Sequence, residues 1–207
     1  RKRDEIQRAE VALRDQRERV AALRRELPLD QPVEDHRFLE LRDGQPHPVP
    51  LSQLVSGTDR PLILMHFMFG KAQTDPCPMC TMWADGYDGV VPHLRQNVEF
   101  AVLAAAEIEA FEAYGRRRGW RNLRLLSAGE STLKRDLGVE TDDGAQHPGV
   151  SVFTRPAGDS LRHVYSQSAD LGEDGFRGMD LLSPVWNDLD LTPNGRGGWF
   201  PSNQYDS

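Results

Sequence analysis

Two cysteines separated by a Pro-Met dipeptide, Cys77-Pro78-Met79-Cys80, constrain this chain more than any other feature of its sequence. Thiols at this spacing can close a disulfide where the start of a helix brings both side chains onto one face. Pro78 disfavours helical dihedral angles at Cys77 and itself suits the first position of a helix. The sequence therefore predicts that a helix begins here, with Cys77 as its N-cap residue and Cys80 one turn inside.

This position predicts different reactivities for the two thiols. Unpaired backbone N–H groups and the helix dipole stabilise a thiolate at a helix N-terminus. We therefore expect the pKa of Cys77 to lie below the free value of about 8.5, while Cys80 should be less exposed. The expected roles are Cys77 as the nucleophile that attacks a disulfide or peroxide, and Cys80 as the thiol that resolves the mixed intermediate.

A structural metal site and a pair of inert thiols are the alternative interpretations of the motif. A zinc site needs about four ligands, and the chain contains no second cysteine pair. His66, His93 and His147 are the remaining candidate ligands. We expect no metal and no other cofactor, because an apolar strand followed by this motif at a helix start is typical of redox proteins.

The composition disfavours partners such as nucleic acid and membrane. The 207 residues include 25 Lys and Arg against 32 Asp and Glu, and the formal net charge of −7 opposes binding to phosphate backbones. No apolar run approaches the ~18 residues needed to cross a bilayer. The start of the sequence lacks a basic-then-apolar signal segment. Since both cysteines lie in one tight motif, we expect a reducing, cytoplasmic location.

Residues 1–30 are expected to form an N-terminal helical arm that ends at Pro28. Apolar residues recur there at alternating spacings of three and four, a pattern that suits either packing on the chain's own domain or a homodimer through this helix. The stripe consists of Ile6, Ala9, Leu13, Gln16, Val20, Leu23 and Leu27, of which Gln16 is polar. Residues 31–195 are expected to form one domain, and residues 196–207 an irregular tail.

Strands and helices alternate in the middle of the chain, which predicts a parallel sheet. The expected strands cover residues 61–69, 98–104 and 123–126, and the expected helices cover residues 77–96, 108–118 and 130–137. Two hairpins are also expected, one turning at Asp43-Gly44 and one turning at residues 157–159, the second adding an antiparallel edge. A short helix capped by Ser52 and ending at Gly57, and a helix near residues 176–191, complete the expected elements.

These segments follow the thioredoxin order of elements, and more specifically they resemble the uncharacterised bacterial family DUF899 over nearly the whole chain. The resemblance implies an α/β, thioredoxin-like fold with a central mixed sheet flanked by helices and an N-terminal helical extension. It rests on His66-Phe67-Met68-Phe69-Gly70, Cys77-Pro78-Met79-Cys80, Trp83-Ala84-Asp85, residues 147–153 and Leu189-Asp190-Leu191-Thr192-Pro193.

The thioredoxin resemblance also implies site residues beyond the cysteines. Pro148 resembles the cis-proline that faces the dithiol and lines a substrate groove, which would place His147 beside the thiols. His66 occupies the strand position of a buried acid beneath the dithiol, and we expect it either to shuttle the proton of Cys80 or to be a satisfied core histidine. Ten residues separate His66 from Cys77, more than in the usual thioredoxin connection.

The motif itself and the helix that continues after it supply the remaining expected groove residues. Pro78 and Met79 lie between the cysteines, and Trp83 is expected either to pack beside the dithiol or to lie in the core. Asp85 is expected to hold a neighbouring element rather than to relay protons.

The sequence favours a thiol–disulfide oxidoreductase that acts on disulfide-containing proteins or small molecules and uses a separate reducing partner of unknown identity. A peroxiredoxin-like thiol peroxidase is the first alternative. The pattern Pro-x-x-x-Thr-x-x-Cys is incomplete here, because Thr74 precedes Cys77 by three residues but Gly70 stands in place of the proline. A non-catalytic binding protein on the same scaffold is the second alternative, and it is disfavoured because a pure binder would not need both thiols.

Overall fold

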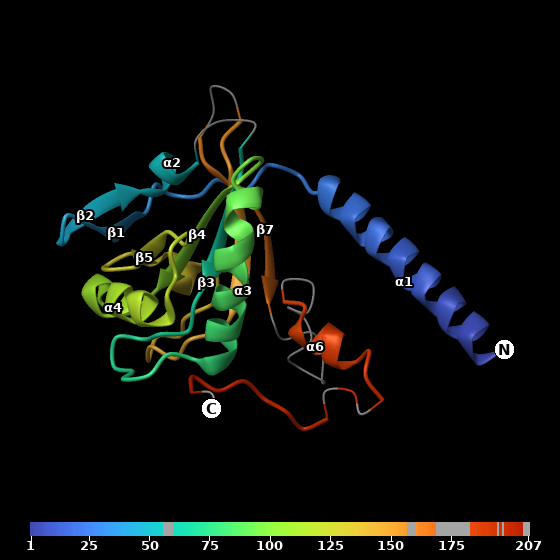
Figure 1. The fold of residues 1–207 in the computed structure, drawn as a ribbon. Helices are drawn as coiled ribbons and strands as arrows, with labels where there is room; N and C mark the ends of the chain where they lie inside the picture. Colours follow the sequence, from blue (N-terminus) through green and yellow to red (C-terminus); the bar gives the residue numbers. More distant parts are fainter. Residues whose placement is uncertain (56–59, 157–159, 169–182, 194, 196, 205–207) are drawn as a thin grey trace.

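The computed structural model describes the chain except for residues 56–59, 157–159, 169–182, 194, 196 and 205–207. Its helices and strands are shown in Figure 1. In chain order they are α1 (Lys2–Arg25), β1 (Arg37–Arg42), β2 (Gln45–Pro50), α2 (Leu51–Leu54), β3 (Leu62–His66), α3 (Pro78–Leu94), β4 (Glu99–Ala104), α4 (Ile108–Arg118), β5 (Leu125–Ser127), α5 (Leu133–Asp136), β6 (Gly149–Thr154), β7 (Arg162–Ser168) and α6 (Val185–Leu189).

The described strands form one mixed sheet in the order β2-β1-β5-β4-β3-β6-β7. Strand β4 pairs in parallel with both β3 and β5, as the alternation of strands and helices predicted. Strands β6 and β7 add the predicted antiparallel edge beside β3. At the other edge, β1 pairs antiparallel with both β2 and β5. The expected α/β fold with a central mixed sheet is therefore confirmed.

The first hairpin turns where the sequence predicted. Asp43 (φ 49°) and Gly44 (φ 77°) both adopt the left-handed backbone conformation that a type I′ turn requires. The flanking residues Arg42 and Gln45 pair directly across the turn. Glycine suits the second turn position because it has no Cβ to clash at positive φ.

Apolar side chains cover both faces of the sheet. Met65 of β3 and Phe100 of β4 pack with α3 and α4 on one face. Leu62 and Leu64 pack with α2 and α5 on the other face. Alternate residues of β3 therefore point to opposite layers, as strand geometry requires, and His66 continues the series that faces α2 and α5.

Helix α2 begins differently from the prediction. The sequence predicted Ser52 as the N-cap, but the helix begins at Leu51 after the N-cap residue Pro50. The N–H and the hydroxyl of Ser52 instead donate to the two carboxylate oxygens of Asp35, at 2.8 and 2.7 Å. A side chain from the preceding segment thus satisfies the helix start, which a local capping rule does not anticipate. The predicted end at Gly57 lies outside the described residues.

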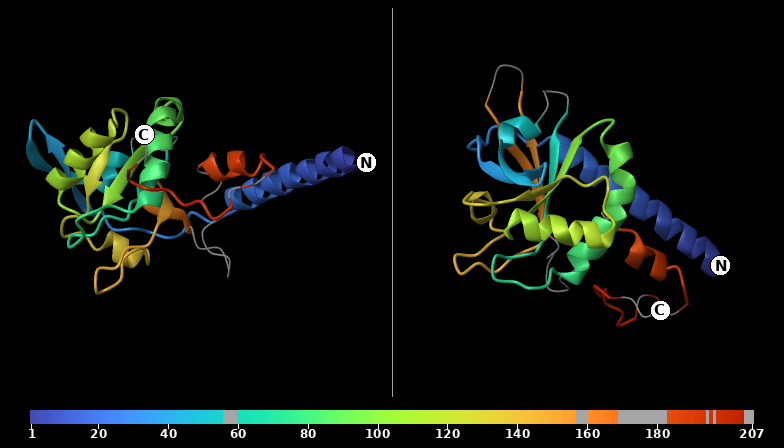
Figure 2. Two further views of the ribbon diagram at one scale, coloured as in Figure 1. Left: turned by 60° about the horizontal axis from the view of Figure 1, so that its bottom comes forward. Right: turned by 60° about the vertical axis from the view of Figure 1, so that its left-hand side comes forward.

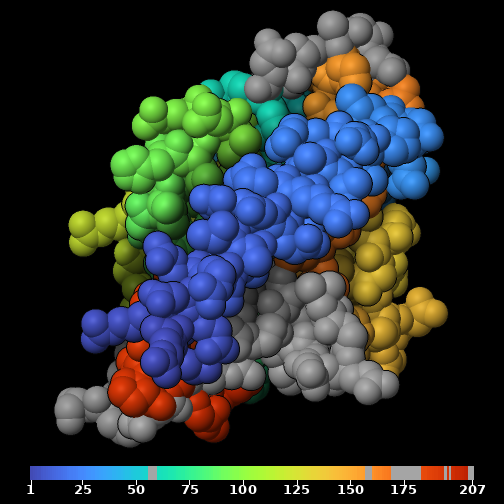
Figure 3. Space-filling view, turned by 90° about the vertical axis from the view of Figure 1, so that its right-hand side faces the viewer, coloured from blue at the N-terminus to red at the C-terminus, as the bar shows by residue number. Residues whose placement is uncertain are grey.

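Helix α1 extends away from the sheet, and Figure 2 shows this in two views. None of its residues is buried, and Ile6, Leu13 and Leu23 of the apolar stripe are 50%, 52% and 53% exposed. At its end, the Arg24 guanidinium donates a hydrogen bond to the Tyr165 hydroxyl at 3.2 Å and lies 5.0 Å from the ring centroid. Figure 3 shows the helix on the outer surface. Neither α1 nor any other described helix is long and apolar enough to cross a membrane.

The C-terminal predictions fall partly outside the described residues. The helix expected near residues 176–191 is described only in its last part, where α6 follows Pro184. The turn of the second hairpin, at residues 157–159, is likewise outside. After Thr192 the described residues form no helix or strand, as predicted for an irregular tail.

Gly115 allows α4 to pack closely on β5. A Cβ at this position would lie 2.7 Å from Cδ1 of Leu125 and 3.1 Å from the Trp120 ring. We expect Gly115→Ala to lower the free energy of unfolding by about 1 kcal/mol, because overpacking outweighs the gain in helix propensity. In the control Gly89→Ala, where nothing lies within 4 Å of the added Cβ, the free energy should rise by about 0.5–1 kcal/mol. Urea denaturation measures both, and a stabilised Gly115→Ala would contradict the close packing.

Candidate functional site

The two cysteines lie at the N-terminus of α3, as the motif predicted. Cys77 is the N-cap, with extended dihedral angles (φ −61°, ψ 125°), and Pro78 is the first residue of the helix. The N–H of Cys77 donates to the carbonyl of Met68 at 3.0 Å, while the N–H of Thr81 donates to the carbonyl of Cys77 at 3.0 Å. Both thiols are free, with Cys77 half-buried and Cys80 buried. The helix start therefore fixes both sulfurs against the segment that follows β3.

The two thiols differ in acidity. The pKa of Cys77 is lowered to about 6, chiefly because the Cys80 thiol donates a hydrogen bond to its sulfur; burial opposes this, and the N–H groups of Cys80 and Met79 add to it. Burial raises the pKa of Cys80 well above its ordinary value, and the interaction with Cys77 raises it further. The N–H of Met68 and the charge of Lys134 act in the opposite direction on Cys80. The direction for Cys77 agrees with the expectation for an N-cap thiol.

A pocket of 180 Å³ opens beside the dithiol. Its lining includes both cysteines together with four residues expected from the sequence, namely Met79, Trp83, His147 and Pro148. Its wall is completed by three residues that the sequence analysis missed, namely Met68, Gln146 and Phe200. Pro78 starts the helix but is not among the lining residues. The structure therefore brings most of the expected groove residues into one site.

Pro148 lies in the predicted place but not in the predicted isomer. No described peptide bond is cis, so the bond between His147 and Pro148 is trans, and the cis-proline implied by the thioredoxin resemblance is wrong. The trans form of an X–Pro bond is favoured by about 0.5–1 kcal/mol. Pro148 still forms a wall of the dithiol pocket directly before β6, beside the predicted His147.

His66 is fully buried at the end of β3. Its Nε2 lies 2.8 Å from Oγ of Ser151, and its Nδ1 has no hydrogen-bond partner among the described residues. Burial lowers the pKa of His66 well below its ordinary value, and the charges of Lys134 and His163 lower it further, so the ring is neutral. One ring nitrogen is therefore satisfied, as in a core histidine, whereas the other has no hydrogen-bond partner among the described residues.

The rest of α3 packs the dithiol helix against its neighbours. Trp83 is 1% exposed and belongs to the core as well as to the pocket wall, so it combines the two predicted roles. Asp85 accepts hydrogen bonds from Nε of Arg118 at 3.2 Å and from Nε1 of Trp120 at 2.7 Å. Asp85 therefore joins α3 to the C-terminal end of α4, the structural role that the sequence favoured.

Gln146 contributes an unpaired acceptor to the pocket wall. Its side chain is 7% exposed, its Nε2 donates to the carbonyl of Gly144 at 3.0 Å, and its Oε1 has no hydrogen-bond partner among the described residues. A buried acceptor without a partner costs folding free energy. Its position next to the predicted His147 is the one signal that could have identified it.

The C-terminal segment also reaches the dithiol. Nδ2 of Asn203 donates to the carbonyl of Pro76 at 2.8 Å, and its Oδ1 accepts from the Tyr114 hydroxyl at 3.2 Å. The Thr81 hydroxyl lies 2.9 Å from the same Tyr114 oxygen and 3.0 Å from the carbonyl of Cys77. These bonds hold the backbone around Cys77 from two sides. The irregular sequence of the tail provided no signal for this contact.

Lys134 of α5 is a buried lysine close to the site. It is 0% exposed, and its Nζ has no hydrogen-bond partner among the described residues. Burial lowers the pKa of Lys134 to about 8, against the opposing charges of Glu140 and Cys80. Its own charge lowers the pKa of both Cys80 and His66, so it acts on both groups. Lysine is seldom buried, and the sequence therefore gave no reason to place it inside.

Within the described part of the chain, no three or more His, Cys, Asp or Glu side chains gather where a metal ion could be held. The histidines considered as ligands are separated: His93 lies in the last turn of α3, whereas His147 lines the dithiol pocket at its start. At a rise of 1.5 Å per residue, the two ends of this helix are about 24 Å apart.

The chain matches, over residues 1–205, the family described as bacterial protein of unknown function (DUF899). No curated protein matches it.

Among solved structures, the chain is similar to peroxiredoxins. A PrxQ mutant of Xylella fastidiosa has 13% identity and a TM-score of 0.53, with 80% of this chain and 97% of that chain covered. The mitochondrial 2-Cys peroxiredoxin of Plasmodium falciparum has 14% identity and a TM-score of 0.53, with 84% and 99% covered. Likeness at this identity shows the fold alone, and it confirms the expected thioredoxin-like class.

We expect the rate of Cys77 alkylation by iodoacetamide to rise with pH through an inflection near 6, because the thiolate reacts and the pKa of Cys77 is lowered to about 6. Since the pKa is lowered, the thiolate forms at lower pH than in an ordinary cysteine. Mass spectrometry of the peptide that carries Cys77 measures this rate. In Cys80→Ala, which lacks the main stabilising hydrogen bond, the inflection should move upward; an unmoved inflection would contradict that cause.

Proposed function

The chain belongs to the DUF899 family of bacterial proteins of unknown function, and we propose that it is a thiol–disulfide oxidoreductase that acts on disulfide-containing proteins or small molecules. One observation carries the proposal, namely the different states of the two thiols. Cys77 is half-buried with a pKa lowered to about 6, and the buried Cys80 donates a hydrogen bond to its sulfur. A stabilised thiolate beside a buried thiol is what a two-step exchange requires.

The exchange proceeds in two steps. The Cys77 thiolate attacks one sulfur of the substrate disulfide, so that a mixed disulfide forms and the other substrate sulfur leaves as a thiolate. Cys80 then loses its proton and attacks the Cys77 sulfur. The bond between Cys77 and Cys80 forms, the mixed disulfide breaks, and the second substrate sulfur leaves as a thiolate. The exchange therefore gives two electrons to the substrate and leaves Cys77 and Cys80 as a disulfide. A separate reducing partner then reduces this disulfide to the dithiol.

The two steps need different environments for the two sulfurs. Cys77 must stay ionised before the attack, and the hydrogen bonds from Cys80 and Met79 hold it in that state. Cys80 must stay protonated until the mixed disulfide exists, and burial holds it in that state. We propose His66 as the group that then takes the proton from Cys80, because its Nδ1 is free of hydrogen bonds to the described residues.

The pocket wall suits a peptide substrate. Met79, Trp83 and Pro148 form an apolar surface beside Cys77, and Phe200, which is 52% exposed, stands at its margin. We also propose a cytoplasmic location, because a reducing compartment keeps the dithiol reduced.

A peroxiredoxin-like peroxidase is the second candidate, and the similarity of the fold to peroxiredoxins is the observation that favours it. In that reaction the Cys77 thiolate attacks a peroxide oxygen, the O–O bond breaks, and a sulfenic acid forms that Cys80 resolves with loss of water. The incomplete Pro-x-x-x-Thr-x-x-Cys pattern before Cys77 argues against it.

We expect the protein to reduce insulin disulfides in the presence of dithiothreitol, and we expect Cys77→Ser to lose this activity completely, because the mixed disulfide can no longer form. Cys80→Ser should retain the first step and accumulate the mixed disulfide. Turbidity and mass spectrometry measure the two outcomes.

Equal activity of the wild type and Cys77→Ser would rule out Cys77 as the nucleophile. Hydrogen peroxide offered to the same samples separates the candidates, because a peroxidase would consume peroxide faster than it reduces insulin. A dithiol that reacts with neither substrate and resists alkylation would favour the non-catalytic binding protein.

We propose that a second copy of the chain covers the apolar stripe of α1 in a homodimer. The stripe keeps heptad spacing, and Ile6, Leu13 and Leu23 are half exposed or more. The double variant Ile6→Asp with Leu13→Asp should therefore be monomeric by light scattering, because two buried charges would oppose helix pairing. The control Gln7→Asp with Arg14→Asp places the same residues beside the stripe and should remain dimeric. A monomeric wild type would contradict the proposal.

A further inference from the structure

The C-terminal segment adds a wall to the dithiol pocket from outside the strands and helices of the fold. Phe200 is one of the residues that line the pocket, and Figure 1 shows its segment, in red, passing the start of α3. The Phe200 ring centroid lies 6.4 Å from that of Trp186, which belongs to the core. The next residue, Pro201, is buried. Phe200 is therefore held from the protein side, while half of its surface remains exposed.

Asn203 fixes this segment next to the nucleophile. Its Nδ2 donates to the carbonyl of Pro76 at 2.8 Å, and its Oδ1 accepts from the Tyr114 hydroxyl at 3.2 Å. Its own carbonyl accepts from Nη1 of Arg118 at 3.3 Å. Pro76 directly precedes Cys77, so the bond to its carbonyl joins the segment to the chain beside the reacting sulfur. Three hydrogen bonds thus give the wall that carries Phe200 a defined position.

The pocket that this wall completes suits one apolar group. Its lining includes the apolar side chains of Phe200, Trp83, Met68, Met79 and Pro148, and no Lys, Arg, Asp or Glu is among the described residues that line it. The pocket has a volume of 180 Å³, and a cavity of about 150 Å³ holds benzene. One aromatic ring or branched aliphatic side chain therefore fits, whereas a charged group would lose hydration without gaining a partner.

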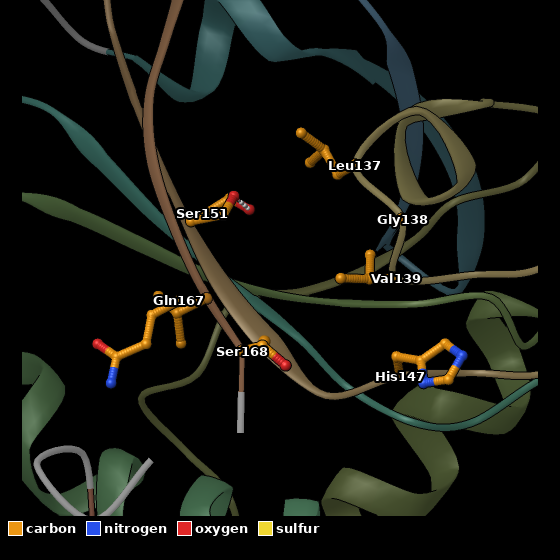
Figure 4. Close-up of a pocket in the computed structure, with 10 residues that line it drawn as sticks. Leu137, Gly138, Val139, His147, Ser151, Gln167 and Ser168 are labelled. Carbon is orange, nitrogen blue, oxygen red and sulfur yellow. Dashed lines mark hydrogen bonds between the residues drawn. The ribbon is translucent and has the colours of Figure 1, made fainter. Parts of the chain in front are cut away.

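A neighbouring cavity of 310 Å³ has a different lining. His147 lines both this cavity and the dithiol pocket. Figure 4 shows Ser151 and Ser168 on one side of the larger cavity and Val139 on the other. Neither cysteine is among its described lining residues. An apolar group bonded close to the reacting sulfur therefore has its place in the dithiol pocket and not in the larger cavity.

We propose that Phe200 is a specificity-determining residue, and that the dithiol pocket selects disulfides that carry one uncharged apolar side chain next to the reacting sulfur. The inference rests on the proposed function and names the substrate class of the same site. Peptide disulfides in which an aromatic or branched aliphatic residue neighbours the cysteine belong to this class. The apolar side chain contacts Phe200 and the other apolar walls while the substrate sulfur meets Cys77.

Phe200 takes no part in the bonds that form and break. The exchange remains the attack of Cys77 on the substrate disulfide, followed by the attack of Cys80 on the Cys77 sulfur. Burial of the substrate side chain instead raises the fraction of encounters in which the disulfide is held at Cys77. The gain therefore depends on the substrate side chain, and a small reagent that leaves the pocket empty does not receive it.

Two matched disulfides test the selection. The disulfide of acetyl-Cys-Phe-amide and that of acetyl-Cys-Ser-amide have the same reacting sulfurs and no charge, and they differ only in the neighbouring side chain. We expect the reduced wild type to react with the Phe peptide about tenfold faster at low substrate concentration, because an aromatic side chain gains free energy on burial. Acid quenching followed by chromatography of the released peptide thiol measures both rate constants.

The variants assign this preference to Phe200. In Phe200→Ala we expect the preference to fall to about twofold, and in Phe200→Leu, which keeps an apolar wall, most of it should remain. The control Trp199→Ala removes the neighbouring aromatic side chain, which is 44% exposed and is not among the residues that line the pocket, and it should keep the tenfold preference. The pH profile of Cys77 alkylation should stay that of the wild type in all three variants, because the groups that lower the pKa of Cys77 lie in α3.

Asn203→Ala tests the fixed position of the wall, and we expect it to reduce the preference as Phe200→Ala does. An equal rate for both peptides in the wild type, or an undiminished preference in Phe200→Ala, would overturn the inference. Loss of the preference in Trp199→Ala would also overturn it, since the segment would then act through general packing. A wild type that reacts with neither peptide disulfide would instead overturn the proposed function.

Discussion

The hydrogen bond from the Cys80 thiol to the Cys77 sulfur is the interaction on which the chemistry of this fold depends. It stabilises a thiolate on Cys77 and at the same time retains the proton on Cys80. Pro78 fixes the start of α3 so that both sulfurs lie on one turn, and parallel pairing of β3 with β4 brings that turn to the end of the sheet.

Three buried polar atoms near the site carry a cost that the rest of the core must offset. Lys134, His66 and Gln146 each bury a polar atom without a hydrogen-bond partner among the described residues. Each such atom costs about 1–3 kcal/mol. All three lie beside or beneath the dithiol, whereas the apolar clusters on both faces of the sheet supply the packing. These three residues therefore carry part of their energetic cost where the chemistry is proposed.

Local rules predicted the elements and the centre of the site, and they failed where distant segments meet. The turn at Asp43-Gly44 and the end of α4 before Gly119 follow from residues that accept positive φ. Cys77 and Cys80 follow from helix capping. Ser52 did not cap α2 because Asp35 does so from another segment. Lys134 and Phe200 reach the site by tertiary packing, which no periodicity in the sequence encodes.

The bond between Asn203 and the carbonyl of Pro76 joins residues that are 127 positions apart. Synthesis at the ribosome proceeds from the N-terminus, so α3 and the sheet strands around it emerge long before the tail that borders the dithiol pocket. Contacts of such large sequence separation also form late in folding, because the loop they close carries a large entropic cost. A nascent chain therefore displays its two thiols without one wall of their pocket. The walled pocket described above is a property of the finished chain alone.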